Sequence, residues 1–146
     1  MKANEIMTES PEVVTPQDSI ARAAQIMRDH DVGLVPVVRD SSSMVLEGVI
    51  TDRDLAVRHV ADCRASDCKV SSHMSREHIS AVEESDDVQT VMATMERAEV
   101  RRVPVTDRNG KLRGIISQAD IAMCEDIPKA KVGEVVQMVS EPKGRD

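Results

Sequence analysis

The chain has 146 residues, of which 40% are hydrophobic and 31% charged, and its formal net charge is -7. This length and apolar content suit one or two compact domains, and the acidic balance argues against a nucleic-acid or anionic-membrane partner. Phe, Tyr and Trp are absent, so aliphatic side chains must fill the interior, and the aromatic platforms on which proteins stack single-stranded nucleic acids are missing.

The N-terminal segment lacks the apolar stretch of a signal peptide, and the longest apolar run is residues 34–38. The three cysteines fit reduced thiols better than a disulfide framework. These features predict a cytoplasmic protein without a membrane partner.

A short strand is predicted near Val13–Thr15, and the helix after it has apolar residues at the i, i+3, i+4, i+7 spacing of a helix buried on one face. The same stripe returns 68 residues further along the chain. The two sets are Ile20, Ala23, Ala24 and Met27, then Val88, Val91, Met92 and Met95.

Two strands then form a hairpin in each copy. Val35-Pro36-Val37 returns as Val103-Pro104-Val105, each followed by a segment rich in turn residues. Beyond that turn the offset falls to 66, and Gly48-x-x-Thr51-x-x-Asp54 lies over Gly114-x-x-Ser117-x-x-Asp120. Each of these motifs follows an apolar strand and precedes a second predicted helix.

The repetition predicts a mixed α/β (α+β) fold with two pseudo-symmetric repeats, each ordered strand, helix, strand, strand, helix. The first strand of the second copy is predicted near Ile79–Ala81. The predicted boundaries are 1–62 and 73–126 for the repeats, 63–72 for a linker, and 127–146 for a C-terminal helix and tail. Because a unit of roughly 60 residues buries little surface alone, the copies are expected to pack about a pseudo-two-fold axis with a ligand cleft between them.

The repeated motifs resemble those of the CBS-domain pair family over about residues 6–126. The resemblance rests on Ile6-Met7-Thr8 and His73-Met74-Ser75, the two Val-Pro-Val strands and the paired Gly-x-x-Thr/Ser-x-x-Asp motifs. It implies a regulatory module, not an enzyme, that binds AMP, ADP, ATP or an S-adenosyl compound such as S-adenosylmethionine, usually as a homodimer.

By the same resemblance, Thr51 and Asp54 in one copy, and Ser117 and Asp120 in the other, contact ribose and phosphate. The chemistry agrees, because the free backbone N–H groups and positive dipole end of a helix N-terminus attract a phosphate, and a carboxylate accepts hydrogen bonds from a ribose diol. The motif also has a purely structural interpretation, since a hydroxyl followed three residues later by an acid is a helix-capping box. Both roles are compatible.

Two arginines are predicted to bind phosphate through charge-assisted contacts, and each occurs in one copy alone. Arg53 lies inside the first motif, where the second has Ala119. Arg102 precedes the second Val-Pro-Val, where the first copy has Leu34. The other predicted ligand-binding residues would flank an adenine base. They are Val14, Thr15, Val35, Pro36, Ser80, Ala81, Val103 and Pro104.

Residues around the linker carry zinc-ligating atoms, namely His59, Cys63, Cys68 and His73. Their spacing lacks the tight Cys-x-x-Cys knuckle, and His59 is as easily an exposed residue on the last turn of a helix, so the sequence favours the absence of a metal site. A metal-linked stress or redox protein remains a weaker alternative.

No arrangement of Ser, Cys, His and carboxylate residues indicates a catalytic site. The main alternative to a ligand sensor is an interaction or dimerisation scaffold with vestigial pockets. In that alternative the acidic surface and residues 132–139 contact an unidentified protein.

Overall fold

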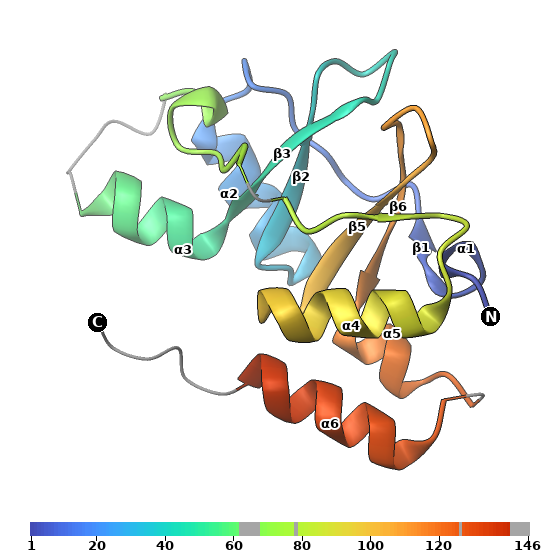
Figure 1. The fold of residues 1–146 in the computed structure, drawn as a ribbon. Coiled ribbons are helices and arrows are strands. Elements are labelled where there is room, and N and C mark those ends of the chain that lie inside the picture. The colour runs from blue at the N-terminus through green and yellow to red at the C-terminus, as the bar shows by residue number, and fades with distance from the viewer. Residues whose placement is uncertain (62–67, 78, 126, 141–146) are drawn as a thin grey trace. The chain divides into compact units, whose positions relative to one another are not determined.

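The computed structural model describes residues 1–61, 68–77, 79–125 and 127–140. The fold is mixed α/β and divides into two compact units (Figure 1). Unit 1 comprises Met1–Ser10, Ser80–Arg108 and Arg113–Asp146, and unit 2 comprises Pro11–Ile79 and Asn109–Leu112.

Unit 1 contains a sheet in the order β1, β6, β5, β4. Its strands are β1 (Thr8–Glu9), β4 (Val82–Glu83), β5 (Arg102–Thr106) and β6 (Leu112–Ser117). β1 runs antiparallel to β6, whereas β4 runs parallel to β5. The first strand of the chain therefore pairs with the last strand of the second sequence copy.

The helices of unit 1 are α1 (Ala3–Ile6), α4 (Val88–Ala98), α5 (Gln118–Ala122) and α6 (Lys129–Ser140). α4 contacts β4, β5 and α6. Val91, Met95, Val103 and Ile116 are fully buried in the resulting core, which aliphatic side chains fill in place of aromatic ones. The predicted C-terminal helix is confirmed as α6, and Val135 anchors it in this core; the side chain of Val139 lies outside the described part.

Unit 2 contains α2 (Ile20–His30), β2 (Leu34–Val38), β3 (Leu46–Thr51), α3 (Asp52–Asp54), the π-helix η1 (Leu55–Val60) and the 3₁₀-helix η2 (Val70–Ser72). β2 and β3 are antiparallel, which confirms the first predicted hairpin. Single bridges add a parallel neighbour to β2 at Val14 and an antiparallel neighbour to β3 at Ser75. The order of segments therefore repeats that of unit 1.

The two sequence copies exchange their opening segments. Thr8 lies opposite Ile115 of β6, whereas Ser75 pairs with Val49 of β3. The predicted repeats are continuous stretches of the sequence, whereas the compact units are not. Residues 1–10 belong to the unit of the second copy, and residues 73–79 belong to the unit of the first.

This exchange explains the glycine of each Gly-x-x-Thr/Ser-x-x-Asp motif. A Cβ on Gly114 would lie 2.7 Å from both the Thr8 carbonyl oxygen and Met7 Sδ, and a Cβ on Gly48 would collide with Ser75 O and Met74 Cε. Glycine is needed where the opening segment crosses the strand closely.

Two expectations about the local fold are wrong. Ala24 is exposed and Ile26 is buried instead, because the core of unit 2 covers a stripe shifted around α2. The first strand of the second copy is β4, Val82–Glu83, and not Ile79–Ala81, since the offset of 68 already applies at this strand. The predicted linker at 63–72 includes a residue that packs in the core: the Val70 side chain is fully buried, and its amide donates to Asp18 O at 2.8 Å.

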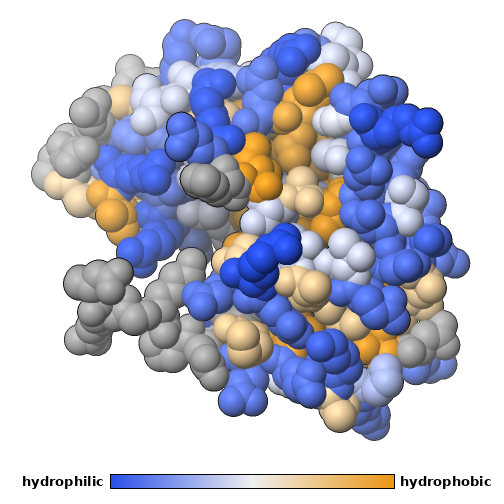
Figure 2. All heavy atoms as spheres, viewed as in Figure 1, coloured by the Kyte–Doolittle hydropathy of each residue, from blue (hydrophilic) through white to orange (hydrophobic). Residues whose placement is uncertain are grey.

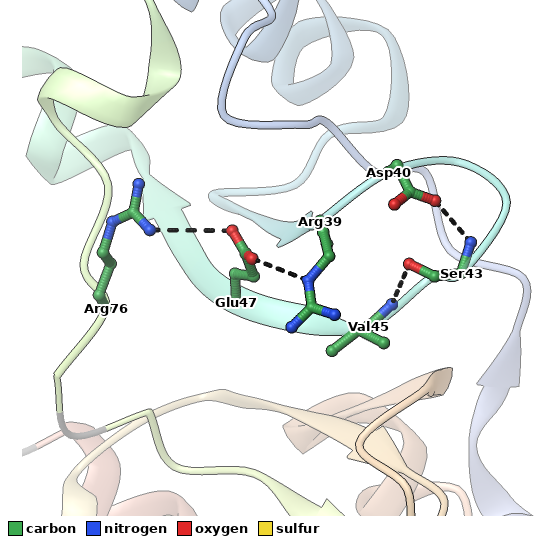
Figure 3. Close-up of polar contacts among 6 residues, drawn as sticks. All are labelled: Arg39, Asp40, Ser43, Val45, Glu47 and Arg76. Carbon is green, nitrogen blue, oxygen red and sulfur yellow. Dashed lines mark hydrogen bonds and ion pairs between the residues drawn. The ribbon is translucent and has the colours of Figure 1, made fainter.

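The hairpin loop after β2 is held by polar side chains (Figure 3). Asp40 Oδ1 accepts hydrogen bonds from the amides of Ser42 and Ser43 at 3.0 and 2.6 Å. Glu47 pairs with Arg39 at 3.3 Å and with Arg76 at 3.7 Å. The hydrogen bond from the Ser43 amide lowers the pKa of Asp40 below its ordinary value, because it favours the ionised carboxylate.

Within the ranges that the structure describes, no helix has the length and apolar character needed to cross a membrane. Figure 2 shows a face covered mostly by hydrophilic side chains. Apolar side chains reach the surface on η1, where Val57 and Val60 are exposed.

Candidate ligand-binding site

The first hydroxyl–acid pair lies where β3 meets α3. Thr51 Oγ1 accepts a hydrogen bond from the Asp54 amide at 3.1 Å, and Asp54 Oδ2 accepts one from the Thr51 amide at 2.9 Å. Thr51 is half-buried and Asp54 is buried. The pair is therefore a complete capping box at a strand-to-helix junction.

The second pair repeats this geometry where β6 meets α5. Ser117 Oγ accepts from the Asp120 amide at 3.2 Å, and Asp120 Oδ2 accepts from the Ser117 amide at 2.8 Å. Ser117 Oγ also donates to Asp120 Oδ2 at 3.0 Å. The structural interpretation of both motifs is confirmed, and the predicted strand-to-helix position of each motif is confirmed with it.

The helix openings offer fewer backbone donors than the sequence suggests. In the first copy the amide of Asp52 donates to Gly33 O at 2.9 Å, that of Arg53 to Asp52 Oδ1 at 2.8 Å, and that of Asp54 to Thr51. The expectation of free amides for a phosphate is wrong at these three positions, because the carbonyl before β2 and the side chains of Thr51 and Asp52 already accept from them.

The second copy repeats two of those bonds, since the Gln118 amide donates to Arg101 O at 2.9 Å and the Asp120 amide donates to Ser117. In both copies, the start of the Val-Pro-Val strand is thus tied to the first residue of the helix. Any ligand at these junctions would have to rely on side chains more than on the first-turn amides.

The two predicted phosphate ligands have different surroundings. Arg53 is exposed on α3, whereas Arg102 is half-buried at the start of β5. A third arginine, Arg58, places Nε 3.7 Å from Asp54 Oδ1. Arg58 was not among the predicted ligands, although its i, i+4 spacing from Asp54 on one helical segment indicates the pair.

The predicted base-flanking residues are mainly core residues. Val14 and Val35 are each 1% exposed in unit 2, and Val103 is fully buried in unit 1; Pro36 and Pro104 are buried too. The aliphatic side chains expected to flank a base are therefore present, but they are already buried in the core of their own unit.

The expected correspondence between the two copies, which matched Val14-Thr15 to Ser80-Ala81, is wrong by two residues. Val14 pairs with Val37 and Val82 pairs with Val105, and the Thr15 amide donates to Asp18 Oδ2 as the Glu83 amide donates to Asp86 Oδ2, both at 2.8 Å. Val82 and Glu83 are the structural counterparts of Val14 and Thr15. Ser80 and Ala81 precede β4, half-buried and exposed respectively.

The hollows described on unit 1 lie away from Ser117 and Asp120. One lies beside α5 and α6 and includes Cys124, Ile127 and Val132 in its lining. Another is lined by Glu83, Glu84, Ser85, Asp107 and Arg108. Neither of these hollows has Ser117 or Asp120 in its lining.

The histidines and cysteines near the linker are closer together than their spacing suggests. His59, Cys68 and His73 place ligating atoms within 4.8 Å of one another. His59 is 6% exposed, so its expected exposure on a last helical turn is wrong. Cys63 lies outside the described residues.

Two regions of the chain, residues 3–59 and 70–124, match the family model of the CBS domain. The protein YlbB of Bacillus subtilis is 34% identical over 145 residues, covering 99% of this chain and 95% of YlbB. Hypoxic response protein 1 of Mycobacterium tuberculosis is 31% identical over 140 residues, covering 96% and 94% of the two chains.

Solved structures agree with these matches. The structure of Hypoxic Response Protein I with two coordinated zinc ions has a TM-score of 0.75 at 31% identity and covers 88% of this chain and 100% of its own. The CBS domain pair of MJ0100, in complex with 5'-methylthioadenosine and S-adenosyl-L-methionine, has a TM-score of 0.71 at 27% identity and covers 84% and 93%. This chain therefore belongs to the CBS-domain family and carries two CBS domains in tandem.

Proposed function

We propose that this protein is a non-enzymatic regulatory module that binds an adenosyl ligand through its two hydroxyl–acid pairs. The observation that carries the proposal is the recurrence of one geometry, Thr51 with Asp54 and Ser117 with Asp120, at the two strand-to-helix junctions. Each copy thus presents a hydroxyl and a carboxylate at the same strand-to-helix position, as two comparable ligand contacts would require.

The capping bonds leave the acids able to contact a ligand. A carboxylate oxygen has two lone pairs, and Asp54 Oδ2 uses one for the Thr51 amide. Arg58 neutralises part of the charge on Oδ1 across 3.7 Å. The remaining acceptor capacity suits the neighbouring hydroxyls of a ribose better than a phosphate, which an acid repels.

The related CBS pair of MJ0100 supports an adenosyl ligand, because its structure contains 5'-methylthioadenosine and S-adenosyl-L-methionine. Adenosine also suits a protein without aromatic residues, since aliphatic walls and backbone groups can hold its base. AMP, ADP, ATP and S-adenosylmethionine are the candidate ligands.

The arginines make the two copies unequal. Arg53 is exposed beside the first motif, whereas the second copy has Ala119 there. Arg102 directly precedes the second Val-Pro-Val, whereas Leu34 directly precedes the first. We expect at least one site to take a phosphorylated ligand, with Arg53 or Arg102 contacting its phosphate. At least one of Arg53→Ala and Arg102→Ala should then weaken nucleotide binding more than adenosine binding, and unchanged affinity in both variants would refute this.

The proposed signalling mode is a population shift in a cytoplasmic homodimer. A ligand that contacts both repeats changes their relative arrangement only as far as its affinities for the alternative arrangements differ. An unidentified protein partner would read that change.

The proposal is tested first on the purified protein without added ligand. With no Tyr or Trp in the chain, an adenine compound bound during purification would dominate ultraviolet absorption, and a denatured, filtered extract would show it. A thermal-shift series with AMP, ADP, ATP and S-adenosylmethionine, and with guanosine nucleotides as controls, then tests binding directly, since a ligand raises stability by RT ln(1 + [L]/Kd).

Stabilisation by an adenosyl compound, and not by its guanosine counterpart, is the expected result. An empty extract together with no stabilisation by any adenosyl compound would refute the proposal. It would favour a scaffold with vestigial pockets, for which the exposed Val57 and Val60 are candidate contact residues.

A further inference from the structure

A second cluster of chemically active side chains lies in unit 2, separate from the capping box of Thr51 and Asp54. It consists of His59 on η1, Cys68 just before η2, and His73 at the end of η2. One ligating atom from each residue lies within 4.8 Å of those of the other two. Both histidines are buried, at 6% and 5% exposure, and Cys68 is half-buried.

The local fold holds this cluster in place by backbone bonds. The Ile20 amide, in the first turn of α2, donates to Cys68 O at 2.8 Å, and the His73 amide donates to Val70 O at 3.0 Å. η1 has the wide turn of a π-helix, with the Ala61 amide donating to Ala56 O at 3.1 Å. Single π-turns are frequent where a helix must direct a side chain to a site.

The histidine geometry matches a zinc ion. Zn–N bonds of about 2.0–2.1 Å at a tetrahedral angle place two ligand nitrogens about 3.3–3.4 Å apart. His59 Nδ1 and His73 Nε2 are 3.3 Å apart. The rings meet edge to face at 78°, with centroids 5.1 Å apart, so the two nitrogens approach each other without stacking of the rings.

We propose that His59, Cys68 and His73 bind a single Zn²⁺ ion. Two imidazole nitrogens and a thiolate are ligands that zinc prefers, and three protein ligands with water in the fourth position are a common zinc arrangement. On binding, the Cys68 thiol releases its proton to solvent and the sulfur forms the bond to the metal. This proposal does not depend on adenosyl binding.

The surrounding charges are compatible with a cation. Arg58 approaches the cluster, with Nη1 3.4 Å from His73 O, but its guanidinium also faces Asp54 at 3.7 Å. The thiolate of Cys68 would supply a further negative charge next to the ion. Asp54 and Cys68 thus offset the repulsion from Arg58.

A simpler arrangement needs no metal. One buried imidazole could donate its N–H to the other across the same 3.3 Å, which would satisfy one nitrogen of each ring. The two accounts differ in what they require of Cys68, because a hydrogen-bonded histidine pair has no use for its thiol.

The experiment uses the full-length protein, stripped of metal with a chelator and kept reduced. Zn²⁺ is titrated in competition with a chromophoric chelator, and Co²⁺ is substituted to read the thiolate-to-metal charge-transfer band. Cys68→Ser and His73→Gln test the ligands. Cys124→Ser and His30→Ala are matched controls, since Cys124 packs in unit 1 and His30 is exposed at the end of α2.

We expect one Zn²⁺ per chain and a cobalt charge-transfer band that disappears in Cys68→Ser. Removing an outer partner of a zinc ligand already costs 10–100-fold in affinity, so losing a ligand should cost about 100-fold or more. Zn²⁺ should raise the melting temperature of both control variants and the unsubstituted protein, but not that of the ligand variants.

Circular dichroism of each metal-free variant checks folding, and Cys68→Ala replaces Cys68→Ser if the latter does not fold. A folded protein that binds less than one Zn²⁺ per chain would overturn the proposal. Binding that persists in both Cys68→Ser and His73→Gln would overturn it equally, because another set of residues would then hold the ion.

Discussion

The double role of the hydroxyl–acid motif leads to a prediction that separates helix capping from ligand binding. Thr51→Ala removes the Oγ1 that accepts from the Asp54 amide at 3.1 Å, while the bond from the Thr51 amide to Asp54 Oδ2 at 2.9 Å can remain. Loss of an N-cap side chain costs about 1 kcal/mol of folding free energy. For a chain of this size, that lowers the melting temperature by about 2–4 °C.

Ser19→Ala is the matched control. Ser19 caps α2, and its Oγ accepts from the Arg22 amide at 3.2 Å, so its loss should lower stability by a similar amount. Ser19 is not among the proposed ligand contacts. The two variants should therefore be alike without ligand and different with it.

The size of that difference follows from one lost hydrogen bond. If Thr51 Oγ1 contacts the ligand, its removal weakens binding by about 1.4 kcal/mol, or tenfold. A ligand present at 100 times its Kd would then stabilise the unsubstituted protein and Ser19→Ala by about 2.7 kcal/mol, but Thr51→Ala by about 1.4 kcal/mol.

The assay is denaturant or thermal unfolding of the three proteins with and without ligand. Ser117→Ala extends the test to the second copy, where the hydroxyl makes two bonds with Asp120. Equal ligand-induced stabilisation in Thr51→Ala, Ser117→Ala and Ser19→Ala would refute the reasoning, since both hydroxyls would then be caps alone.

Three further predictions concern stability. Gly114→Ala should destabilise the protein by about 1–3 kcal/mol, because the new Cβ would lie 2.7 Å from the Thr8 carbonyl oxygen. Gly133→Ala in α6 should instead stabilise it by about 0.5–1 kcal/mol, because a Cβ there would have no atom within 4 Å. Chemical denaturation measures both changes. Met95→Ala should cost about 2–5 kcal/mol because Met95 is fully buried, whereas Met138→Ala, on a residue 42% exposed, should change the unfolding free energy by less than about 0.5 kcal/mol; similar effects would contradict the assigned core. The lowered pKa of Asp40 means that its ionised carboxylate stabilises the fold at pH values above its ordinary pKa of 3.8, and that this stabilisation is lost as the pH falls through the folded-state pKa. The difference in unfolding free energy between the unsubstituted protein and Asp40→Asn should therefore shrink on acidification. A difference that stays constant would exclude this contribution.

Local patterns in the sequence predicted much of the fold, because the relevant interactions are short in range. The Val-Pro-Val strands, the first hairpin and both capping boxes depend on residues within a few positions of one another, and all are present. The mixed α/β class followed from their repetition.

Contacts between distant segments were not predictable in the same way. The exchange of opening segments pairs Thr8 with Ile115 and Ser75 with Val49, and no local pattern specifies partners so far apart. The glycines of both motifs reflect the exchange, but only the folded structure shows which backbone crosses them.

The candidate sites show the same limit. Spacing identified Thr51 and Asp54 but not that backbone and side-chain acceptors already occupy the first amides of α3. For the metal cluster, the sequence argued against a site because it lacks a Cys-x-x-Cys knuckle and because His59 was as easily an exposed residue on a last helical turn. The π-turn of η1 and the anchoring of η2 bring His59 and His73 together, and neither has a clear sequence pattern.

The central claim is that the acids of both copies hold an adenosyl ligand, and calorimetric titration of the metal-free protein tests it most directly. AMP, ADP, ATP and S-adenosylmethionine are titrated into the unsubstituted protein, Asp54→Asn, Asp120→Asn and the control Ser19→Ala. We predict saturable binding of at least one compound, weakened about tenfold or more by a substitution of Asp54 or Asp120 and unchanged in Ser19→Ala. Absence of saturable binding by any of the four compounds, or affinities that both Asp→Asn variants leave unaltered, would contradict the claim.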